Sequence, residues 1–403
     1  MERQILHVDV NNAFLSWTAV NMLKQGYDRD IRTIPAIIGG DEERRSGIVL
    51  AKSPVAKKFG IVTGEPIYFA KKKCNKLEVF PVNFEVFKYY SDKLFELLSE
   101  YTDVIERFSI DECFMDLTNF LGKRKLMDVA IEINSRVEKE LGFTVNVGVS
   151  TNKLLAKMAS DFEKPNKIHT LYEYEVEDKM WPLPVGELFG IGKKTVPKLY
   201  NLGIKTIGDL AKQDKDFMLR KFGKMGLYMI EAANGIDDSE VNNKVEEPKS
   251  ISNEVTLPKD VSEFEKLENL LVALSEQVSF RLRKHGLVAS TVSVNLKTKD
   301  FQNYSHQRPL KYQTSSTKEI LETAVEILKE MYKGEPIRLI GLKVDKLEHK
   351  DEVQMTFFDK DDKQERIDSA VDSLKKKYGY NMVTRAGKME VNKLVEGKEK
   401  KMK

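Results

Sequence analysis

Cysteine is nearly absent from this chain of 403 residues, and the two that occur, Cys74 and Cys113, stand far apart. Because there is no C-x-x-C pair, the sequence argues against a disulfide scaffold and against a zinc ribbon. The five histidines are scattered and form no H-x-x-x-H pair that would bind zinc. These absences exclude the common sulfur- and histidine-ligated metal centres.

A surplus of one charge is lacking as well, since 66 basic side chains face 63 acidic ones and leave a net charge of +3. Any binding of nucleic acid must therefore come from local basic patches rather than from bulk charge. No uninterrupted apolar stretch is long enough to span a bilayer, and the N-terminus shows no signal-peptide segment. We expect a cytoplasmic protein of two to four domains with no membrane partner.

The first part of the chain predicts a mixed sheet with helices on one face. Segments with the pattern of strands are 5–10, 77–81, 104–110, 113–117 and 143–149. Amphipathic patterns predict helices at 85–101, 127–141 and 152–162. The first strand pattern is almost continuously apolar, which is typical of a strand buried on both faces.

The second part of the chain has a different organisation. Residues 185–211 are helical and punctuated by glycine, and 236–249 are polar and typical of a linker. The order β-α-β-β-α-β follows over 252–347 and predicts a split βαβ unit.

Three carboxylates stand where the apolar pattern does not favour them. Asp9 lies near the end of the first strand pattern, while Asp111 and Glu112 fall between two apolar halves of R-F-S-I-D-E-C-F-M-D-L. Neighbours on a regular strand point to opposite faces, but at a hairpin corner that alternation breaks and both can approach one site. Clustered carboxylates repel one another unless a cation compensates them or one is protonated.

Ligation by oxygen alone suits Mg²⁺, and two such ions can hold the attacking and leaving oxygens of a phosphoryl transfer. The plainer interpretation makes Asp111 and Glu112 a polar turn and Asp9 the cap of a strand. Each residue taken singly favours that plainer interpretation. The three together, with the motifs around them, favour a metal site.

A set of ordered motifs surrounds these carboxylates. The carboxylates lie in two motifs, H-V-D-V-N-N-A-F and F-S-I-D-E-C-F-M-D. Four further motifs are G-I-V-L-A-K-S-P-V-A-K-K-F-G-I-V-T-G-E-P-I, V-G-V-S-T-N-K-L-L-A-K-M-A-S-D, E-K-P-N and F-G-I-G-K-K-T-V. Together they resemble the motifs of Y-family DNA polymerases, in particular the bacterial DinB or polymerase IV group. The resemblance covers roughly residues 5–350, and the ordered set is far more specific than S-I-D-E alone.

The resemblance implies an α+β fold arranged as a right-hand polymerase with palm, small fingers, helix-hairpin-helix thumb and split βαβ little finger. The implied domains are the catalytic palm at 1–10 and 72–165, fingers at 11–71, thumb at 166–240, little finger at 245–348 and a C-terminal tail at 349–403. A fingers segment of this size has little mass to close over a nascent base pair, so discrimination by shape is weak. We therefore expect low fidelity and tolerance of damaged templates.

The resemblance also assigns roles to residues of the centre. Asp9 and Asp111 would bridge two Mg²⁺ ions, Glu112 would hold the ion nearer the primer 3′-OH, and the carbonyl of Val10 would complete the second site. Phe14 matches a steric gate whose ring excludes a ribose 2′-OH, with an ordinary core phenylalanine as the alternative.

Lys57 and Lys164 match positions that hold the incoming triphosphate, where a lysine acts as a point charge. Solvated surface lysines are the alternative. Many relatives have a tyrosine where this chain has Pro54 and an arginine where it has Lys57, so a phenolic donor and a bidentate fork are missing. Asn11 replaces an aspartate that is common in relatives.

The segment F-G-I-G-K-K resembles a helix-hairpin-helix turn. Gly190 and Gly192 would let backbone N–H groups approach a phosphate, and Lys193 and Lys194 would add positive charge. The alternative is a glycine cap between packed helices. The contact implied is a sequence-independent grip on the DNA backbone.

An apolar cluster interrupts the charged tail. Gln354, Met355, Phe357 and Phe358 resemble the Q-L-x-L-F type of peptide by which bacterial polymerases bind the sliding clamp. The glutamine would supply directional hydrogen bonds while the apolar side chains fill a groove. The alternative is that they pack against the little finger or a helix at about 365–378.

The predicted function is DNA-directed addition of dNTPs to a primer 3′-OH by two-metal phosphoryl transfer, for lesion bypass in DNA repair. The expected partners are primer–template DNA, dNTP and the sliding clamp, and the expected assembly is a monomer. A nucleotidyl cyclase also uses paired carboxylates but would lack the helix-hairpin-helix and the split βαβ unit. A non-enzymatic DNA-binding scaffold that recruits repair factors would not need all three carboxylates.

Overall fold

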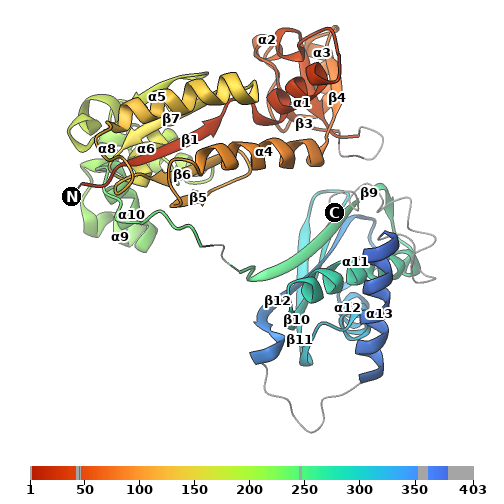
Figure 1. The fold of residues 1–403 in the computed structure, drawn as a ribbon. Helices are drawn as coiled ribbons and strands as arrows, with labels where there is room; N and C mark the ends of the chain where they lie inside the picture. The colour runs from red at the N-terminus through yellow and green to blue at the C-terminus, as the bar shows by residue number, and fades with distance from the viewer. Residues whose placement is uncertain (1, 42–44, 46, 245–246, 353–361, 380–403) are drawn as a thin grey trace. The chain divides into compact units, whose positions relative to one another are not determined.

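The computed structural model describes residues 2–41, 45, 47–244, 247–352 and 362–379. The chain divides into two compact units, Met1–Gly39 with Val49–Val245, and Gly40–Ile48 with Glu246–Lys403. Figure 1 shows the elements of each unit. The predicted boundaries among palm, fingers and thumb fall within the first unit and remain predictions.

A five-stranded sheet forms the centre of the first unit (Figure 1). Its strands, in spatial order, are β5 (Ile105–Arg107), β6 (Glu112–Asp116), β1 (Ile5–Val10), β7 (Val145–Ser150) and β8 (Ile168–Thr170). Neighbours pair antiparallel except β7 and β8, which are parallel. All six residues of β1 are buried, as its apolar pattern predicts.

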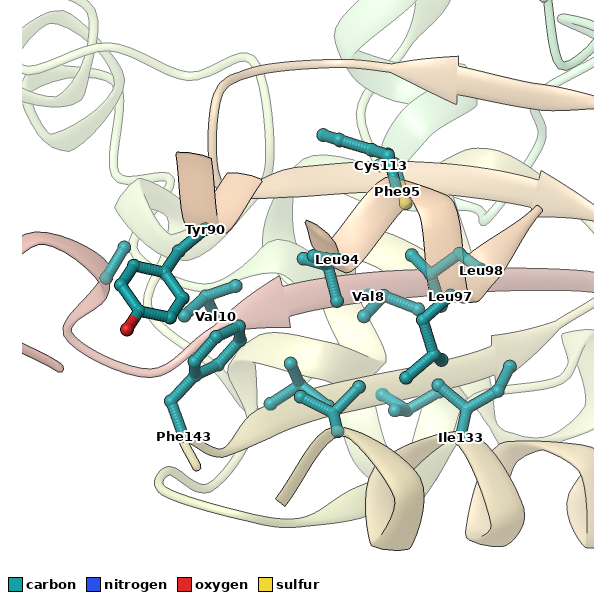
Figure 2. Close-up of a cluster of buried hydrophobic side chains, with 14 of the residues drawn as sticks. Val8, Val10, Tyr90, Leu94, Phe95, Leu97, Leu98, Cys113, Ile133 and Phe143 are labelled. Carbon is teal, nitrogen blue, oxygen red and sulfur yellow. The ribbon is translucent and has the colours of Figure 1, made fainter. Parts of the chain in front are cut away.

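Helices cover both faces of this sheet, so the expectation of helices on one face was wrong. Val8 and Val10 point into one cluster with side chains of α4 (Phe84–Leu98) and α5 (Leu126–Arg136), as Figure 2 shows. Ile5 faces the other way and packs with Ala156 of α6 (Lys153–Asp161). The physical reason is that a strand apolar on both sides must be covered on both sides.

A second, small sheet joins two strands from the predicted fingers, which were expected only as a mixed segment, to a third strand in the predicted palm, where a strand was expected at 77–81. Its strands, in spatial order, are β3 (Val49–Lys52), β2 (Ala36–Gly39) and β4 (Glu78–Pro81). The accompanying helices are α1 (Ala13–Lys24), η1 (Ile31–Thr33), α2 (Pro54–Lys58) and α3 (Ile67–Lys73). These elements enclose a core of their own that includes Ile37, Val49 and Ile67.

Short helices make up the remainder of the first unit. They are η2 (Val137–Leu141), which continues α5, then η3 (Glu173–Glu175), η4 (Val176–Met180), η5 (Val185–Glu187), α7 (Val196–Asn201), α8 (Ile207–Ala211), α9 (Lys215–Phe222) and α10 (Lys224–Ala233). Apolar residues from η4 to α10 share one core with α6. The predicted thumb is therefore packed against the helix that covers one face of the central sheet.

The second unit is a four-stranded antiparallel sheet covered by helices. Its elements in chain order are β9 (Ser250–Val261), α11 (Phe264–Lys284), β10 (Leu287–Thr298), β11 (Asn303–Thr314), α12 (Thr317–Met331), β12 (Ile337–His349), η6 (Lys350–Glu352) and α13 (Asp362–Tyr378). The spatial order β11-β10-β12-β9 and the chain order β-α-β-β-α-β confirm the predicted split βαβ arrangement.

The last helix of this unit docks through charged side chains. Arg283 of α11 donates to Asp372 of α13 at 2.6 Å, and Lys375 Nζ lies 3.3 Å from Glu276 Oε2. Asp368 accepts from the backbone N–H of Thr317 at the start of α12. Over the described ranges, no helix is both long and apolar enough to cross a membrane.

Candidate active site

Two of the predicted carboxylates face each other across neighbouring strands. Asp9 of β1 pairs directly with Glu112 of β6. Side chains of directly opposed residues project from the same face of a sheet. Because Ile5 lies on the face covered by α6, the alternation along β1 places Asp9 on that face too.

The third carboxylate lies in the turn that leads into β6. The carbonyl of Asp111 accepts from the N–H of Val10 at 3.0 Å, and Ser109 Oγ donates to Asp111 Oδ1 at 2.6 Å. Burial raises the pKa of Asp111, and the charges of Asp9 and Glu112 raise it further against the hydrogen bond from Ser109. The three carboxylates therefore act electrostatically as one group at the end of β1.

Two lysines, one from α6 and one from the loop after it, neutralise part of the charge of these three carboxylates. Lys157 Nζ lies 2.6 Å from Glu112 Oε2. Lys164 Nζ pairs with Asp9 and lies 2.7 Å from Asp161 Oδ1. Burial alone would raise the pKa of Glu112, but hydrogen bonds from His7 and Lys157 and the charge of Lys157 lower it to about 2.

No group of three or more His, Cys, Asp or Glu side chains in the described ranges is arranged to hold a metal ion as it stands. Glu112 and Asp9 each contact a lysine, and Asp111 contacts a hydroxyl. The donor chemistry nevertheless fits a divalent cation that prefers oxygen, because three carboxylates and the end of β1 meet there. Their excess of negative charge is what such a cation would compensate.

Sequence reasoning missed Lys157 and His7. Lys157 stands in the apolar stretch L-L-A-K-M-A and is only 9% exposed, which is unusual for a lysine. His7 is fully buried, its Nε2 lies 3.3 Å from Glu112 Oε2, and burial lowers its pKa. The signal available in the sequence was a basic residue inside an otherwise apolar helical pattern.

Asn11 has a structural role that the sequence did not reveal. Its side-chain oxygen accepts from the N–H of Asn166 at 2.8 Å and from the hydroxyl of Thr144 at 3.0 Å, and its amide donates to Asn146. These bonds fix the loop that carries Lys164 against the end of β1. Asn11 is therefore an anchor for this loop.

Two other predicted residues lie in the segment predicted as the fingers. Phe14 is partly buried in α1, with its ring centroid 4.5 Å from that of Phe87. Lys57 is exposed in α2, and the described contacts tie it to no carboxylate. The structure thus brings Lys164, but not Lys57, to the three carboxylates.

The helix-hairpin-helix segment runs from η5 through a turn to α7. Gly190 has a φ of +90°, a backbone conformation that glycine adopts without strain. Lys193 and Lys194 are exposed in the turn, beside Gly192. The predicted clamp-binding residues Gln354, Met355, Phe357 and Phe358 lie outside the described residues.

Three family models match the chain in succession, with residues 162–174 and 205–247 between the matched ranges. They are the impB/mucB/samB family at residues 8–161, the IMS family HHH motif at 175–204 and the impB/mucB/samB family C-terminal domain at 248–357. The matched helix-hairpin-helix range includes the predicted Gly190–Lys194 turn.

Curated relatives agree over nearly the whole length. A DNA polymerase IV of Clostridium acetobutylicum is 50% identical over 97% of this chain and 99% of its own length. A DNA polymerase IV of Acetivibrio thermocellus is 38% identical over 96% and 97%, and DNA polymerase IV 1 of Bacillus subtilis is 35% identical over 96% and 94%. A solved Y-family DNA polymerase chimera has a similar fold, with a TM-score of 0.74, 24% identity and coverage of 86% of this chain and 99% of that one.

The chain belongs to the Y family of DNA polymerases, in its DinB-type branch. It is a DNA-directed DNA polymerase of translesion synthesis and DNA repair, and the predicted α+β right-hand fold is confirmed. Enzymes of this kind bind primer–template DNA and dNTP and generally use divalent metal ions.

Proposed function

We propose that this polymerase joins a dNTP to the primer 3′-OH at the α6-covered face of the palm sheet, with Asp9, Asp111 and Glu112 as metal ligands. The observation that carries the proposal is the direct pairing of Asp9 with Glu112 while Asp111 closes the same end of β1. Two Mg²⁺ ions bound there, with the Val10 carbonyl as a further ligand, would supply charge stabilisation for the phosphoryl transfer.

The chain's own residues do the positioning. Lys164 stands beside Asp9, so its ammonium is already placed at the carboxylates where the triphosphate must bind. Asn11 holds that loop in place through Asn166. Lys57, from the fingers, would add a second positive charge along the triphosphate, as a point charge rather than a bidentate fork.

Phe14 is proposed as the residue that selects the sugar. Its ring contacts the buried Phe87 in a tilted arrangement at the start of α1, five residues after Asp9, and this contact restricts its orientation. A rigid ring near the sugar would exclude a 2′-hydroxyl by shape.

We propose that the helix-hairpin-helix binds the DNA backbone through Gly190, Gly192, Lys193 and Lys194. Exposed lysines and accessible N–H groups recognise phosphate without reading sequence. Gln354, Met355, Phe357 and Phe358 are proposed to bind the sliding clamp. The proposed working form is a monomeric cytoplasmic enzyme divided into palm, fingers, thumb, little finger and tail as the sequence predicts.

Primer extension by the purified chain tests the proposal. With Mg²⁺ and dNTPs it should add the nucleotide complementary to the template, on undamaged and on damaged templates, and release pyrophosphate. A scaffold would bind the DNA without extending the primer. A cyclase would convert a purine nucleoside triphosphate without primer or template, and either result would contradict the proposal.

A further inference from the structure

The predicted fingers expose a pair of aromatic rings. Tyr68 and Phe69 are consecutive in α3, and 58% and 52% of their surfaces are exposed. Their ring centroids lie 5.6 Å apart in an edge-to-face arrangement. The same helix buries Ile67 and Ala70 in the small core, so the two rings are not needed to pack the fingers.

Two more large apolar side chains are exposed just before α3. Phe59 is 47% exposed and Val62 is 54% exposed. Single exposed apolar side chains are normal on protein surfaces. A segment that exposes Phe59, Val62, Tyr68 and Phe69 is instead typical of a binding surface.

Positive charge accompanies these side chains. Residues 49–78 contain seven lysines and two glutamates, with no arginine or aspartate, which gives a local net charge of +5. Both glutamates are paired, since Glu65 accepts from Lys73 at 2.6 Å and Glu78 lies 3.1 Å from Arg29. Lys72 Nζ lies 4.4 Å from the centroid of the Tyr68 ring.

We propose that the α3 surface, formed by Phe59, Val62, Tyr68, Phe69 and Lys72, binds the unpaired template strand ahead of the primer terminus. Aromatic rings interleaved with lysines suit single-stranded nucleic acid, because bases stack on the rings while ammonium groups neutralise phosphates. Stacking of this kind is indifferent to sequence, so it serves normal and damaged templates alike. The inference rests on the proposed polymerase function, since only a copied template presents such a strand.

Charge favours this occupant over a second copy of the chain. A surface with a local charge of +5 would meet the same charge on an identical copy, whereas the template strand is uniformly negative.

Fluorescence anisotropy of the full chain with labelled primer–templates tests the inference, without dNTP so that no extension occurs. Two substrates are compared, with a template 5′ overhang of one nucleotide or of about ten nucleotides. Only the longer overhang is long enough to fill a typical single-strand binding site. The wild type should bind the long overhang more tightly. The double variant Tyr68→Ala/Phe69→Ala should bind the long overhang about tenfold more weakly than the wild type, the order of one lost base stack, with unchanged affinity for the short overhang.

Matched variants separate stacking from other effects. The overhang gain is the ratio of the affinity for the long overhang to the affinity for the short one. Tyr174→Ala removes an aromatic ring that is 79% exposed elsewhere in the first unit, and this variant should keep the full overhang gain. Tyr68→Phe/Phe69→Tyr retains two rings and should also keep it. An overhang of abasic nucleotides keeps the phosphates but removes the bases, so most of the gain should disappear with it.

Three results would overturn the inference: no overhang gain in the wild type, an equal gain in the alanine variant, or a full gain with the abasic overhang. Loss of self-association in the alanine variant, with its overhang gain intact, would make the surface an interface between copies and overturn it as well. Extension of the short-overhang substrate is measured in parallel. An active polymerase without the gain overturns this inference alone, and an inactive protein that shows the gain overturns the proposed function alone.

Discussion

Each acidic residue at the end of β1 has a partner that the chain itself supplies. Glu112 contacts Lys157 and His7, Asp9 contacts Lys164, and Asp111 contacts Ser109. Buried charges are tolerated only when they are paired, so these contacts offset the cost of bringing the carboxylates together. The lysines also place positive charge where the triphosphate would bind.

Lys157 is predicted to stabilise the fold through Glu112. Lys157→Met should lower the free energy of unfolding at pH 7 by about 1–3 kcal/mol, because it leaves a largely buried carboxylate without its cation. The pKa of Glu112 is lowered from 4.5 to about 2, so the stability it contributes is present above pH 4.5 and is lost as the pH falls toward 2. The difference between variant and wild type in urea unfolding should therefore shrink over that window.

The matched control is Lys167→Met, which removes a lysine that is about half exposed and 3.6 Å from Glu163. It should change stability little at any pH. A Lys157→Met difference that stays constant from pH 7 to pH 2 would show that the lysine acts through packing rather than through Glu112.

Phe14 is predicted to control the choice of sugar. Phe14→Ala should raise the ratio of ribonucleotide to deoxynucleotide incorporation by about tenfold or more, as removal of a steric wall from a pocket does. Single-nucleotide insertion with rNTP and dNTP measures the ratio. Phe120→Ala, at an exposed position, is the control. An unchanged ratio with a lowered melting temperature would make Phe14 a core residue only.

At the scale of single residues, the sequence predicted the three acidic residues of the site but not the basic side chains that contact Glu112. Asp9, Asp111 and Glu112 interrupt apolar strands, so the pattern itself marked them. Lys157 reaches Glu112 because α6 folds back over the sheet, and His7 reaches it because β1 pairs with β6, so the partners are about 45 and 105 positions from Glu112 in the sequence. No local pattern specifies such a pairing.

At the scale of secondary-structure elements, the close packing of α6 on β7 determines how near Lys157 comes to Glu112. A Cβ on Gly148 of β7 would lie 1.8 Å from the carbonyl oxygen of Ala156 and 2.7 Å from the nitrogen of Ser160. Backbone atoms cannot yield as side chains do, so α6 can sit at this depth only over a glycine. The same helix carries Lys157 to Glu112.

Gly148→Ala is accordingly predicted to be severe. It should lower the free energy of unfolding by about 3 kcal/mol or more, at the upper end of the cost of overpacking, because α6 must move away from the sheet. Gly192→Ala is the control, since its added Cβ would meet nothing within 4 Å. Denaturant unfolding of both variants measures the difference, and equal stability of the two would contradict the close packing of α6 on β7.

Element order was predictable where the periodicity was long and regular. The split βαβ unit has strands of 12 or 13 residues and amphipathic helices, and it was predicted correctly. The strands β2 and β3 of the predicted fingers have four residues each, too few to show an alternating pattern, whereas β4 was predicted as a strand at 77–81. The second helical layer on the palm was missed although the apolar run 5–10 implied a strand buried on both faces.

At the scale of the whole molecule, the proposed contact with the sliding clamp would hold the polymerase on its DNA substrate. Binding of the proposed clamp peptide would make contact with the primer end intramolecular, and the overall avidity can then exceed the single-site affinity by about 10²–10⁴. The triple variant Gln354→Ala/Phe357→Ala/Phe358→Ala should therefore lose clamp-stimulated synthesis and keep clamp-independent extension. Tyr378→Ala, an exposed aromatic position of α13, is the control.

Titration of loaded clamp into wild type, triple variant and control measures the stimulation. If the triple variant is stimulated as strongly as the wild type, these residues pack internally or the clamp contact lies elsewhere in the chain.

The central claim is that the three carboxylates at the end of β1 carry the phosphoryl transfer. Its most direct test is a paired measurement on Asp111→Ala, with Asp178→Ala at an exposed position as the control. Primer extension should be abolished in Asp111→Ala, while primer–template affinity stays within about twofold of wild type, because phosphate contacts elsewhere supply that affinity. Extension by Asp111→Ala at a rate near that of the wild type would contradict the assignment of the site.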